Sequence, residues 1–371
     1  MMMRALRGSL SALRREAVAT AWVDSGSTET LEAKPLRDRG ARIDRLRLMV
    51  QVAWLVVVVS IGAQFVAWVR GIESGHATVG RPGGVEAFLP ISALLSLRHL
   101  IETGGVSPIR PAGFVIFLLI VATGLLLKRA FCSWVCPVGT LSEWLGRLSR
   151  GTFGRRLKLP RWLDLPLRSV KYLLLAFFVW AVFVQMSRAS VAAFLDSPYN
   201  RVADVKMLYF FEHPTPLAVR ILAGLAVLSY LIPYFWCRYL CPYGGLLGVL
   251  SLVSPIKVTR DAPSCIDCGR CTKACPSHLP VARLGRVRSD ECFACLSCVA
   301  ACPVPRALRL ETPGPWRRAV RPAALAALLM ALFVGGSYAA KAAGLWRTNV
   351  SDAEYAQRVH ELDSAGYDHP R

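Results

Sequence analysis

Two cysteine arrays constrain this chain more than any other feature of its sequence. Residues 265–276 and 292–303 each read Cys-x-x-Cys-x-x-Cys-x-x-x-Cys-Pro. In such an array a compact turn directs three thiolates toward one point, and the fourth cysteine follows on the next segment, where it reaches the site of the other array. The two arrays therefore predict a pair of reciprocal four-thiolate sites within one small unit.

This ligand spacing is that of a protein unit that holds two 4Fe-4S clusters. We assign one cluster to Cys265, Cys268, Cys271 and Cys302, and the other to Cys292, Cys295, Cys298 and Cys275. Structural zinc is the main alternative, but zinc sites typically pair two ligands with two more at a distance and need no third cysteine in the turn. Disulfide bonds are a second alternative, and they require an oxidising compartment.

The hydrophobic content indicates a membrane protein. The 371 residues are 54% hydrophobic, which exceeds what a soluble domain needs. Because a helix rises about 1.5 Å per residue, an uncharged run of about 16 residues nearly crosses a hydrocarbon core of about 30 Å. A buried helix of a soluble core is the alternative for the shorter runs. We expect five transmembrane helices, at Leu48–Val69, Pro111–Leu127, Tyr172–Ser187, Ile221–Cys237 and Pro322–Ala340.

Basic residues flank these runs where a membrane interface is expected. They are predicted to extend their charged ends to the surface of the bilayer, and they are Arg110, Lys128, Lys171, Arg220 and Arg238. Tryptophans near the same positions, such as Trp134, are expected to belong to the aromatic belt of the interface. Tyr209, Glu212 and His213 are likewise expected to be ordinary interfacial residues.

The charge distribution predicts the topology. Residues 1–47, 128–171 and 238–321 carry ten, ten and thirteen basic side chains, against six, two and five acidic ones. The segments between them are nearly neutral. With five spans the two sets lie on opposite sides of the bilayer, and the positive-inside rule places the basic set in the cytoplasm. The net charge of +21 is thereby explained without nucleic-acid binding, for which the chain shows no motif.

The predicted fold is an α-helical integral membrane protein with an inserted α+β dicluster ferredoxin-like domain in the cytoplasm. No short apolar run follows the first arginines, so we expect no cleavable signal peptide. Residues 1–45, a polar and Arg-rich segment, are expected to form an amphipathic surface helix or to stay disordered. The predicted domains are a polar, Arg-rich cytoplasmic extension (1–46), a four-helix membrane domain (47–253), the two-cluster domain (254–312), the fifth helix (313–340) and a periplasmic tail (341–371).

The four remaining cysteines lie in an internal repeat. Residues 132–137 and 237–242 both read Cys-x-x-x-Cys-Pro and are 105 residues apart. The same offset relates a proline before each motif and a glycine after it, namely Pro111 with Pro216 and Gly139 with Gly244. We expect each motif to end a transmembrane helix at the cytoplasmic surface, with both cysteines on one helical face and the proline stopping the helix.

If the two repeats converge, these cysteines form a second kind of site at the membrane surface. The candidate redox or catalytic residues are Cys132, Cys136, Cys237 and Cys241. Four thiolates there either hold a further metal centre or cycle between dithiol and disulfide. The alternative is that these cysteines are small apolar residues at helix ends.

Paired Cys-x-x-x-Cys-Pro motifs followed by two long cysteine arrays resemble the NapH/NosR-type membrane-bound polyferredoxins. The resemblance covers roughly residues 45–310, including the segment Arg81–Glu86 and Pro90. It implies a bacterial inner-membrane electron carrier that oxidises quinol or serves metalloenzyme maturation. The chain departs from the short nitrate-type members in its extension and in its fifth span, with a tail that ends at Asp368–Arg371. It lacks the large flavin-binding domain of the nitrous-oxide type, so no covalent flavin is expected.

A quinone site is expected at the outer face. Ala87–Leu97 is an apolar run that is too short to cross the membrane and is interrupted by Pro90, so we expect a half-helix or re-entrant segment. Glu86, Arg98 and His99 flank this run and are the candidate quinone-binding residues, because charge at the edge of the hydrocarbon region is costly and often functional. The alternative is that Glu86 and Arg98 cap the two ends of the half-helix.

The sequence thus favours a membrane-bound iron–sulfur protein that passes electrons between the quinone pool and a redox partner protein. An assembly or maturation factor that reduces a metal ion or a disulfide of another metalloenzyme is the alternative. A redox-sensing scaffold without turnover is a third hypothesis. The sequence leaves the direction of electron flow open.

Overall fold

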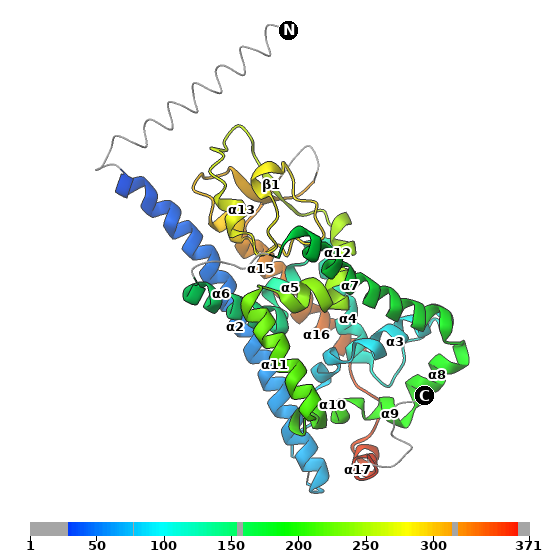
Figure 1. Cartoon of the computed structure of the whole chain (residues 1–371). Helices are drawn as coiled ribbons and strands as arrows, with labels where there is room; N and C mark the ends of the chain where they lie inside the picture. The colour runs from blue at the N-terminus through cyan, green and yellow to red at the C-terminus, as the bar shows by residue number, and fades with distance from the viewer. Residues whose placement is uncertain (1–28, 77, 154–158, 314–317, 363–371) are drawn as a thin grey trace.

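The structure is a computed structural model. It describes residues 29–76, 78–153, 159–313 and 318–362, so part of the predicted extension (1–28) and the chain end at Asp368–Arg371 lie outside it. Helices make up most of the described chain, and a small sheet lies at one end (Figure 1). The longest helix is α2 (Glu29–Glu73), and it runs from the sheet end of the molecule to the opposite end (Figure 1).

Three helices of the described chain are long and apolar enough to cross a membrane. They are Asp38–Glu73 within α2, Arg161–Gln185 and Pro322–Ala342. A fourth span results if α10 (Ala203–Glu212) and α11 (Pro216–Leu231) count together, although they are bent by 81°. The composite helices consist of α7 Arg161–Trp180 with η2 Ala181–Gln185, and of α15 Pro322–Met330, η5 Ala331–Gly335 and α16 Gly336–Ala342. Three or four spans are therefore supported, and the predicted number of five is not confirmed.

The two remaining predicted spans are shorter helices in the structure. Pro111–Leu127 coincides with α4, whose 17 residues are apolar but give a length of only about 25 Å. Ile221–Cys237 corresponds to α11, which ends at Leu231 because Pro233 follows it and disfavours helical geometry in the residue before. Tyr234 then takes a φ of 60°, which turns the chain.

Large apolar side chains on these helices point away from the protein. Val56 of α2 is 58% exposed, Leu173 of α7 is 67% exposed and Ile221 of α11 is 53% exposed. Exposed apolar surface of this extent is unfavourable in water and is normal in contact with lipid chains. The exposed residues therefore support a membrane protein.

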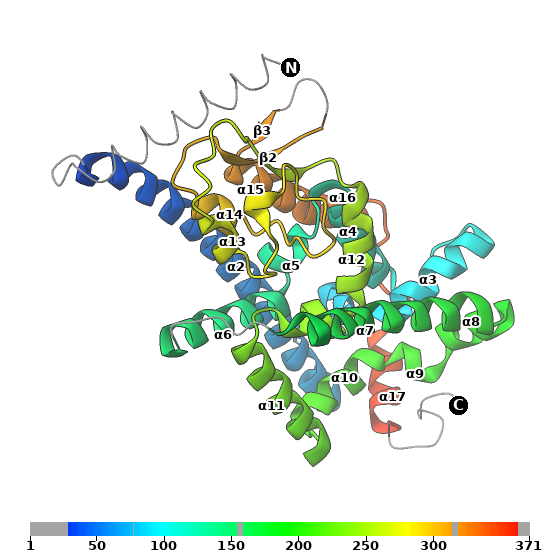
Figure 2. The same cartoon turned by 45° about the horizontal axis from the view of Figure 1, so that its top comes forward.

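Residues 257–313 and 318–320 form a small body of loops, short helices and a three-stranded antiparallel sheet (Figure 2). The strand order is β1-β2-β3, and Val258 of β1 lies opposite Leu310 of β2. Both side chains are almost fully buried, so the sheet covers the core of this body. Its elements are β1 Lys257–Arg260, α13 Arg270–Ala274, η4 Val281–Arg283, α14 Ser297–Ala300, β2 Leu308–Glu311 and β3 Ala319–Val320.

The predicted boundary after residue 46 falls inside α2, so the described part of the extension continues the first span as one helix. This part of α2 packs against α14. Gly40 lies so close to Ala300 that a Cβ atom would come within 2.6 Å of the Ala300 carbonyl oxygen. Arg47 is buried and donates from Nη1 to the carbonyl of Cys295 at 2.6 Å. These contacts explain why the helix continues beyond its apolar run.

The segment between the first two spans differs from the expected half-helix at Ala87–Leu97. A 3-10 turn, η1 (Gly83–Phe88), is followed by α3 (Pro90–Thr103). Pro90 starts this helix instead of interrupting it, because the first helical position needs no backbone N–H donor. Beyond η2, two further helices, α8 (Arg188–Asp196) and α9 (Pro198–Arg201), lead to α10.

The predicted tail contains a docked helix, α17 (Asp352–His360). Tyr355 of α17 is 1% exposed and packs edge-to-face against Trp68 of α2, with ring centroids 4.9 Å apart. Both rings belong to an apolar cluster that also contains Val85 and Val205. The tail therefore covers the end of the molecule opposite the sheet (Figure 1).

The packing of α17 gives a first prediction. Replacing Tyr355 by Ala removes a fully buried ring, so we expect the free energy of unfolding to fall by about 3–5 kcal/mol. Chemical unfolding in detergent, followed by tryptophan fluorescence, measures this loss. Gln357→Ala on the exposed side of the same helix is the control and should change stability by less than about 0.5 kcal/mol. Equal effects of the two substitutions would show that α17 does not contribute to the core.

Candidate metal centres

Two cavities in the small body are lined by the eight cysteines of the long arrays. One cavity is lined by Cys265, Cys268, Cys271 and Cys302, and the other by Cys275, Cys292, Cys295 and Cys298. Each quartet combines three cysteines of one array with the last cysteine of the other, which is the grouping that the predicted ligand sets require. The ligand assignment itself stays a prediction.

The same backbone conformation shapes both arrays. Asp267 and Gly269 in the first array have φ values of 53° and 69°, and Ala294 and Leu296 at the equivalent positions of the second have 50° and 58°. Left-handed residues in alternation turn the chain sharply, so that successive thiols face one side. Leu296 adopts this conformation at an energetic cost, since a bulky L-residue rarely does so. We infer that the surrounding structure enforces the turn.

The residues around the cavities suit a cluster rather than a single ion. A 4Fe-4S cube is larger than one ion, so its thiolate ligands surround a space instead of meeting at a point. Burial raises the pKa of Cys275 to about 12 and also raises the pKa of Cys298 well above its ordinary value. These thiols therefore ionise only with a cationic partner such as bound iron.

Three consecutive backbone carbonyls attach the second cysteine array, residues 292–303, to helix α2 and to the short helix at residues 130–134. Ser133 Oγ donates to the carbonyl of Phe293 at 2.7 Å, and Trp134 Nε1 donates to that of Ala294 at 3.1 Å. The third carbonyl, of Cys295, accepts from the α2 arginine described above. Trp134 is fully buried, so its predicted place in an aromatic belt is wrong. Its indole is an anchor for the second array because it can donate one hydrogen bond while its ring fills the core.

The Cys-x-x-x-Cys-Pro motifs do not lie on single helical faces as predicted. Cys132 is on a short helix, α5 (Ala130–Trp134), and Cys136 lies beyond its end. In the second copy, Cys237 is in a π-helical turn, η3 (Trp236–Leu240), and Cys241 follows it. In both copies the N–H of the second cysteine donates to the carbonyl five residues earlier, at 2.9 Å. The cysteines of each pair thus occupy a widened turn.

The prolines of these motifs begin helices and do not stop them. Pro137 starts α6 (Pro137–Phe153), and Pro242 starts α12 (Pro242–Val253). Proline at the first helical position is favourable because its fixed φ already suits the helix. The Cys241 sulfur accepts from the N–H of Gly244 at 3.4 Å and caps the second of these helices.

The two repeats bring their four cysteines together. Cys237 interacts electrostatically with Cys132, Cys136 and Cys241, and Cys136 interacts with Cys132 and Cys241. Cys132 and Cys237 are only 5% and 3% exposed. Arg129 lies between the copies, since Nη2 donates to the carbonyl of Cys237 at 3.0 Å and the guanidinium interacts electrostatically with Cys132. The four cysteines of the two repeats therefore lie near one another, and their joint role stays a prediction.

In each repeat, the glycine that follows the Cys-x-x-x-Cys-Pro motif is required for close packing. A Cβ atom on Gly139 would lie 1.9 Å from the carbonyl oxygen of Cys132, and one on Gly244 would lie 2.5 Å from that of Cys237. Real Cβ atoms do not approach this closely, so the backbone would have to shift. The glycine that both copies share thus indicates that they have the same backbone geometry.

A second prediction follows from this contact. Gly139→Ala should reduce the free energy of unfolding by at least about 1–3 kcal/mol, the usual cost of overpacking, because the obstructing atom belongs to the backbone. Thermal unfolding of the purified protein in detergent measures the loss. Gly224→Ala in α11 is the control, since nothing lies within 4 Å of its added methyl group. A Gly139→Ala protein as stable as the control would contradict the packing.

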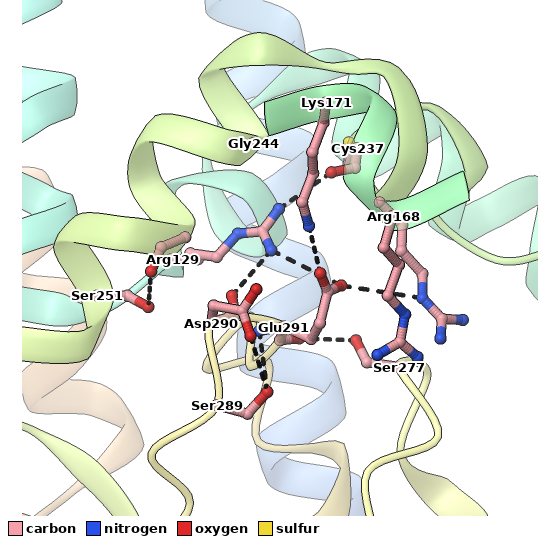
Figure 3. A network of polar contacts seen from close by, with 12 residues as sticks. Arg129, Arg168, Lys171, Cys237, Gly244, Ser251, Ser277, Ser289, Asp290 and Glu291 are labelled. Carbon is pink, nitrogen blue, oxygen red and sulfur yellow. Dashed lines mark hydrogen bonds and ion pairs between the residues drawn. The ribbon is translucent and has the colours of Figure 1, made fainter. Parts of the chain in front are cut away.

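A buried network of charges joins the repeat to the second array (Figure 3). The Glu291 carboxylate forms an ion pair with Lys171 of α7 and lies 3.9 Å from Arg129 and 3.8 Å from Arg238. Glu291, Lys171 and Arg129 are all at most 2% exposed. Arg129 also donates to the Asp290 carbonyl at 2.9 Å. Lys128, Lys171 and Arg238 were predicted to reach the bilayer surface, and instead they bind the loop before Cys292. Of the same predicted set, Arg110 is buried against Asp204 and Arg220 is exposed.

An aromatic ring lies between the two cysteine sites. Phe293 follows Cys292 directly and lines the second cavity. Its ring stacks on that of Tyr234 with centroids 4.6 Å apart, and the Arg129 guanidinium lies 4.3 Å from its centroid. Phe293 and Arg129 therefore connect the second cavity to the second copy of the repeat at Cys237.

The charge network gives a third prediction. Glu291→Ala would leave three buried cations without their shared carboxylate, so we expect the free energy of unfolding to fall by about 3–5 kcal/mol. Chemical unfolding of the detergent-solubilised protein measures the effect. Asp44→Ala removes an exposed carboxylate of α2 and should change it by less than about 0.5 kcal/mol. A Glu291→Ala protein of unchanged stability would mean that the network does not hold the loop.

The candidate quinone residues belong to two separate polar networks. Glu86 pairs with Arg81 at 3.0 Å, and its other oxygen accepts from the N–H of Gly113 at 2.8 Å in the first turn of α4. Glu86 thus caps α4 and not α3, so the alternative capping role predicted for it is wrong. Arg98 pairs with Glu102 at 2.9 Å and donates to the Val182 carbonyl. His99 is half-buried on α3, and quinone binding at these residues stays a prediction.

Sequence reasoning missed the acidic centre of this outer network. Asp204 of α10 is fully buried and pairs with Arg81 at 2.7 Å and with Arg110 at 3.0 Å. No motif surrounds Asp204 in the sequence. The one sequence signal for this acidic centre is the pair Arg81 and Arg110, because arginines that become buried need an acidic partner. On the same side, Tyr209 donates to Glu73, while Glu212 and His213 line a shallow polar pocket with Arg70.

Comparison with known sequences supports the cysteine sites. Residues 109–156 and 215–260 match a family described as a 4Fe-4S binding domain. Residues 257–303 match a family described as a 4Fe-4S dicluster domain. The first match covers both copies of the repeat, and the second covers both long arrays up to Pro303.

Several curated proteins share most or part of the chain. YccM of Escherichia coli strain K12 is 43% identical over 331 residues, which are 86% of this chain and 91% of YccM. The ferredoxin-type protein NapH of the same strain is 28% identical over 217 residues, which are 56% of this chain and 70% of NapH. The regulatory protein NosR of Pseudomonas aeruginosa is 25% identical over 195 residues, which are 51% of this chain and 26% of NosR.

No solved structure matches the chain. The two family matches and the extensive identity with YccM nevertheless establish its relationships, because together they cover the repeat, the long arrays and the connecting helices. The chain therefore belongs to the NapH/NosR-type family of membrane-bound ferredoxin-type proteins.

Proposed function

We propose that this protein passes single electrons between the quinone pool of a bacterial inner membrane and a redox partner protein. The observation that carries the proposal is the pair of cysteine-lined cavities attached to apolar helices of membrane length. Bound 4Fe-4S clusters would supply one-electron chemistry, and the chain would supply the ligands, the burial and the spacing. YccM, whose name proposes electron transport, and the ferredoxin-type NapH agree with this role.

The arrangement of the residues favours an order along the path. The first cavity has an exposed cysteine, Cys268, at its edge, whereas Cys295 and Cys298 of the second cavity are buried against the helices. Phe293 and Arg129 then lead from the second cavity to Cys132 and its three partners. The first quartet is thus the solution side of the path and the second is its membrane side.

We propose that Cys132, Cys136, Cys237 and Cys241 hold a further metal centre. The match of both repeats to a 4Fe-4S binding family and the mutual proximity of the four thiols support this role. The alternative of dithiol–disulfide exchange in a maturation factor requires access for a second thiol. The burial of Cys132 and Cys237 disfavours it.

The topology proposal follows from charge and helix length. Five spans, α2, α4, α7, α11 and α15–α16, would place residues 254–312 and the N-terminus in the cytoplasm and α17 in the periplasm. The shorter helices α4 and α11 would then cross with help from the arginines at their ends. Polar residues on the α17 side, among them Glu86, Arg98 and His99, remain the proposed region for quinone.

Electron exchange with quinone is the fourth prediction. The anaerobically reduced protein should regain the visible absorbance of oxidised iron–sulfur clusters when a water-soluble quinone analogue is added. The Cys298→Ser protein lacks one predicted ligand of the second quartet, so we expect its oxidation by quinone to slow at least tenfold while it remains reducible from solution. Stopped-flow absorbance measures both rates. An absorbance that stays unchanged over minutes in the unmodified protein would exclude quinone as a partner.

A further inference from the structure

We infer that the surface around the first cysteine array is a docking site for an acidic one-electron carrier protein, an inference that rests on the proposed function. The first cavity reaches the surface of the protein. Cys268, one of its lining residues, is exposed, and Ile266 beside it is 43% exposed. An exposed apolar residue next to a predicted cluster ligand gives a partner protein a short path for electron transfer and an apolar contact that it can bury.

The second array cannot serve the same purpose. The carbonyls of residues 293–295 are occupied by Ser133, Trp134 and Arg47, and its cavity is lined by the loop that binds Lys171. A soluble protein would have to displace these buried contacts to approach it. The first array is therefore the place where electrons can pass to or from solution.

Basic side chains surround the exposed edge of the first cavity. Arg270 and Lys273 lie on α13, directly after Gly269, and Arg306 lies in the loop that leads from Cys302 to β2. All three side chains are exposed, and none of them forms an ion pair or side-chain hydrogen bond with the described residues. The charges are available to a partner of opposite sign, which sets the orientation and raises the rate of association.

The acidic side chains in the same region are already engaged. Asp267 pairs with Arg260 at 2.9 Å, and Asp261 accepts a hydrogen bond from Ser264. The surface thus presents a net positive field around Cys268. Residues 1–28 contain four arginines and two acidic residues, so their net charge is also positive. They are therefore not complementary to this surface.

Anionic lipid is the other class of partner that basic residues attract. The position of the surface favours a protein, because α13 and β1 lie at the end of the molecule away from α17, beyond the exposed apolar side chains of α2 and α7 (Figure 1). Transfer needs no other reactant. One electron leaves the carrier and enters the chain, or the reverse, and no covalent bond or proton is exchanged.

The experiment compares two charge-reversed proteins of equal net charge. The test variant carries Arg270→Glu, Lys273→Glu and Arg306→Glu, and the control carries Arg42→Glu, Arg45→Glu and Arg288→Glu at other exposed positions. Each detergent-solubilised protein is mixed with a reduced plant-type ferredoxin as the acidic probe, and separately with a small photochemical reductant. Stopped-flow absorbance at several salt concentrations gives the second-order rate constants.

We expect the rate constant with ferredoxin to fall tenfold or more in the test variant and less than threefold in the control. The unmodified protein should lose this advantage as salt rises, because screening removes the attraction. Equal losses in both variants, or a rate independent of salt, would overturn the inference. So would test substitutions that weaken binding to anionic lipid vesicles while the ferredoxin rate is unchanged. Failure of the unmodified protein to accept electrons from the small reductant would instead refute the proposed function.

Discussion

Hydrogen bonds to three consecutive carbonyls, at residues 293–295, hold the cysteine-rich body on the helices. Their donors come from α5 and α2, which belong to different parts of the chain. A turn that gathers three thiols must expose its peptide groups on the outer side, and unsatisfied buried carbonyls would be costly. The membrane part supplies the donors, so the second array is fixed in position relative to the repeat. The rest of the site depends on this attachment.

The internal repeat provides the other half of the same arrangement. Its two copies share a widened turn, a glycine in contact with the first cysteine's carbonyl and a proline that starts the next helix. Arg129 belongs to one copy and binds both the other copy and the loop before Cys292. Buried charge of this kind is costly unless an opposite charge lies close to it, and the Glu291 carboxylate supplies that charge. The two kinds of cysteine site are therefore parts of one packed interface.

Cysteine spacing carried most of what the sequence predicted about the site. The arrays fix which thiols can meet, because the turn is local and the fourth ligand follows at a set distance, and the two cavities group the cysteines accordingly. The repeat likewise predicted the convergence of Cys132 with Cys237. Hydropathy found the apolar helices, and the family resemblance is confirmed by the matches that cover both motif types.

The incorrect predictions have a common physical cause. A local sequence pattern does not show which residues, distant in the sequence, will contact it in the folded protein. Lys171 and Trp134 stand where interfacial residues stand, and only the loop brought in from residues 289–295 makes them buried anchors. Proline at the second motif was expected to stop a helix, but the same residue is equally suited to begin one. Glu86 caps a helix that is distant in sequence, at Gly113, and Asp204 has no local signature.

Iron and acid-labile sulfide content tests the central claim most directly. If the two quartets of the small body each hold a 4Fe-4S cube, the anaerobically purified protein contains at least about eight atoms of iron and eight of sulfide per chain. A content clearly above eight that falls to eight in a Cys132→Ser, Cys237→Ser protein would place another centre at the repeat. A colourless preparation with zinc in place of iron and no sulfide would contradict the account.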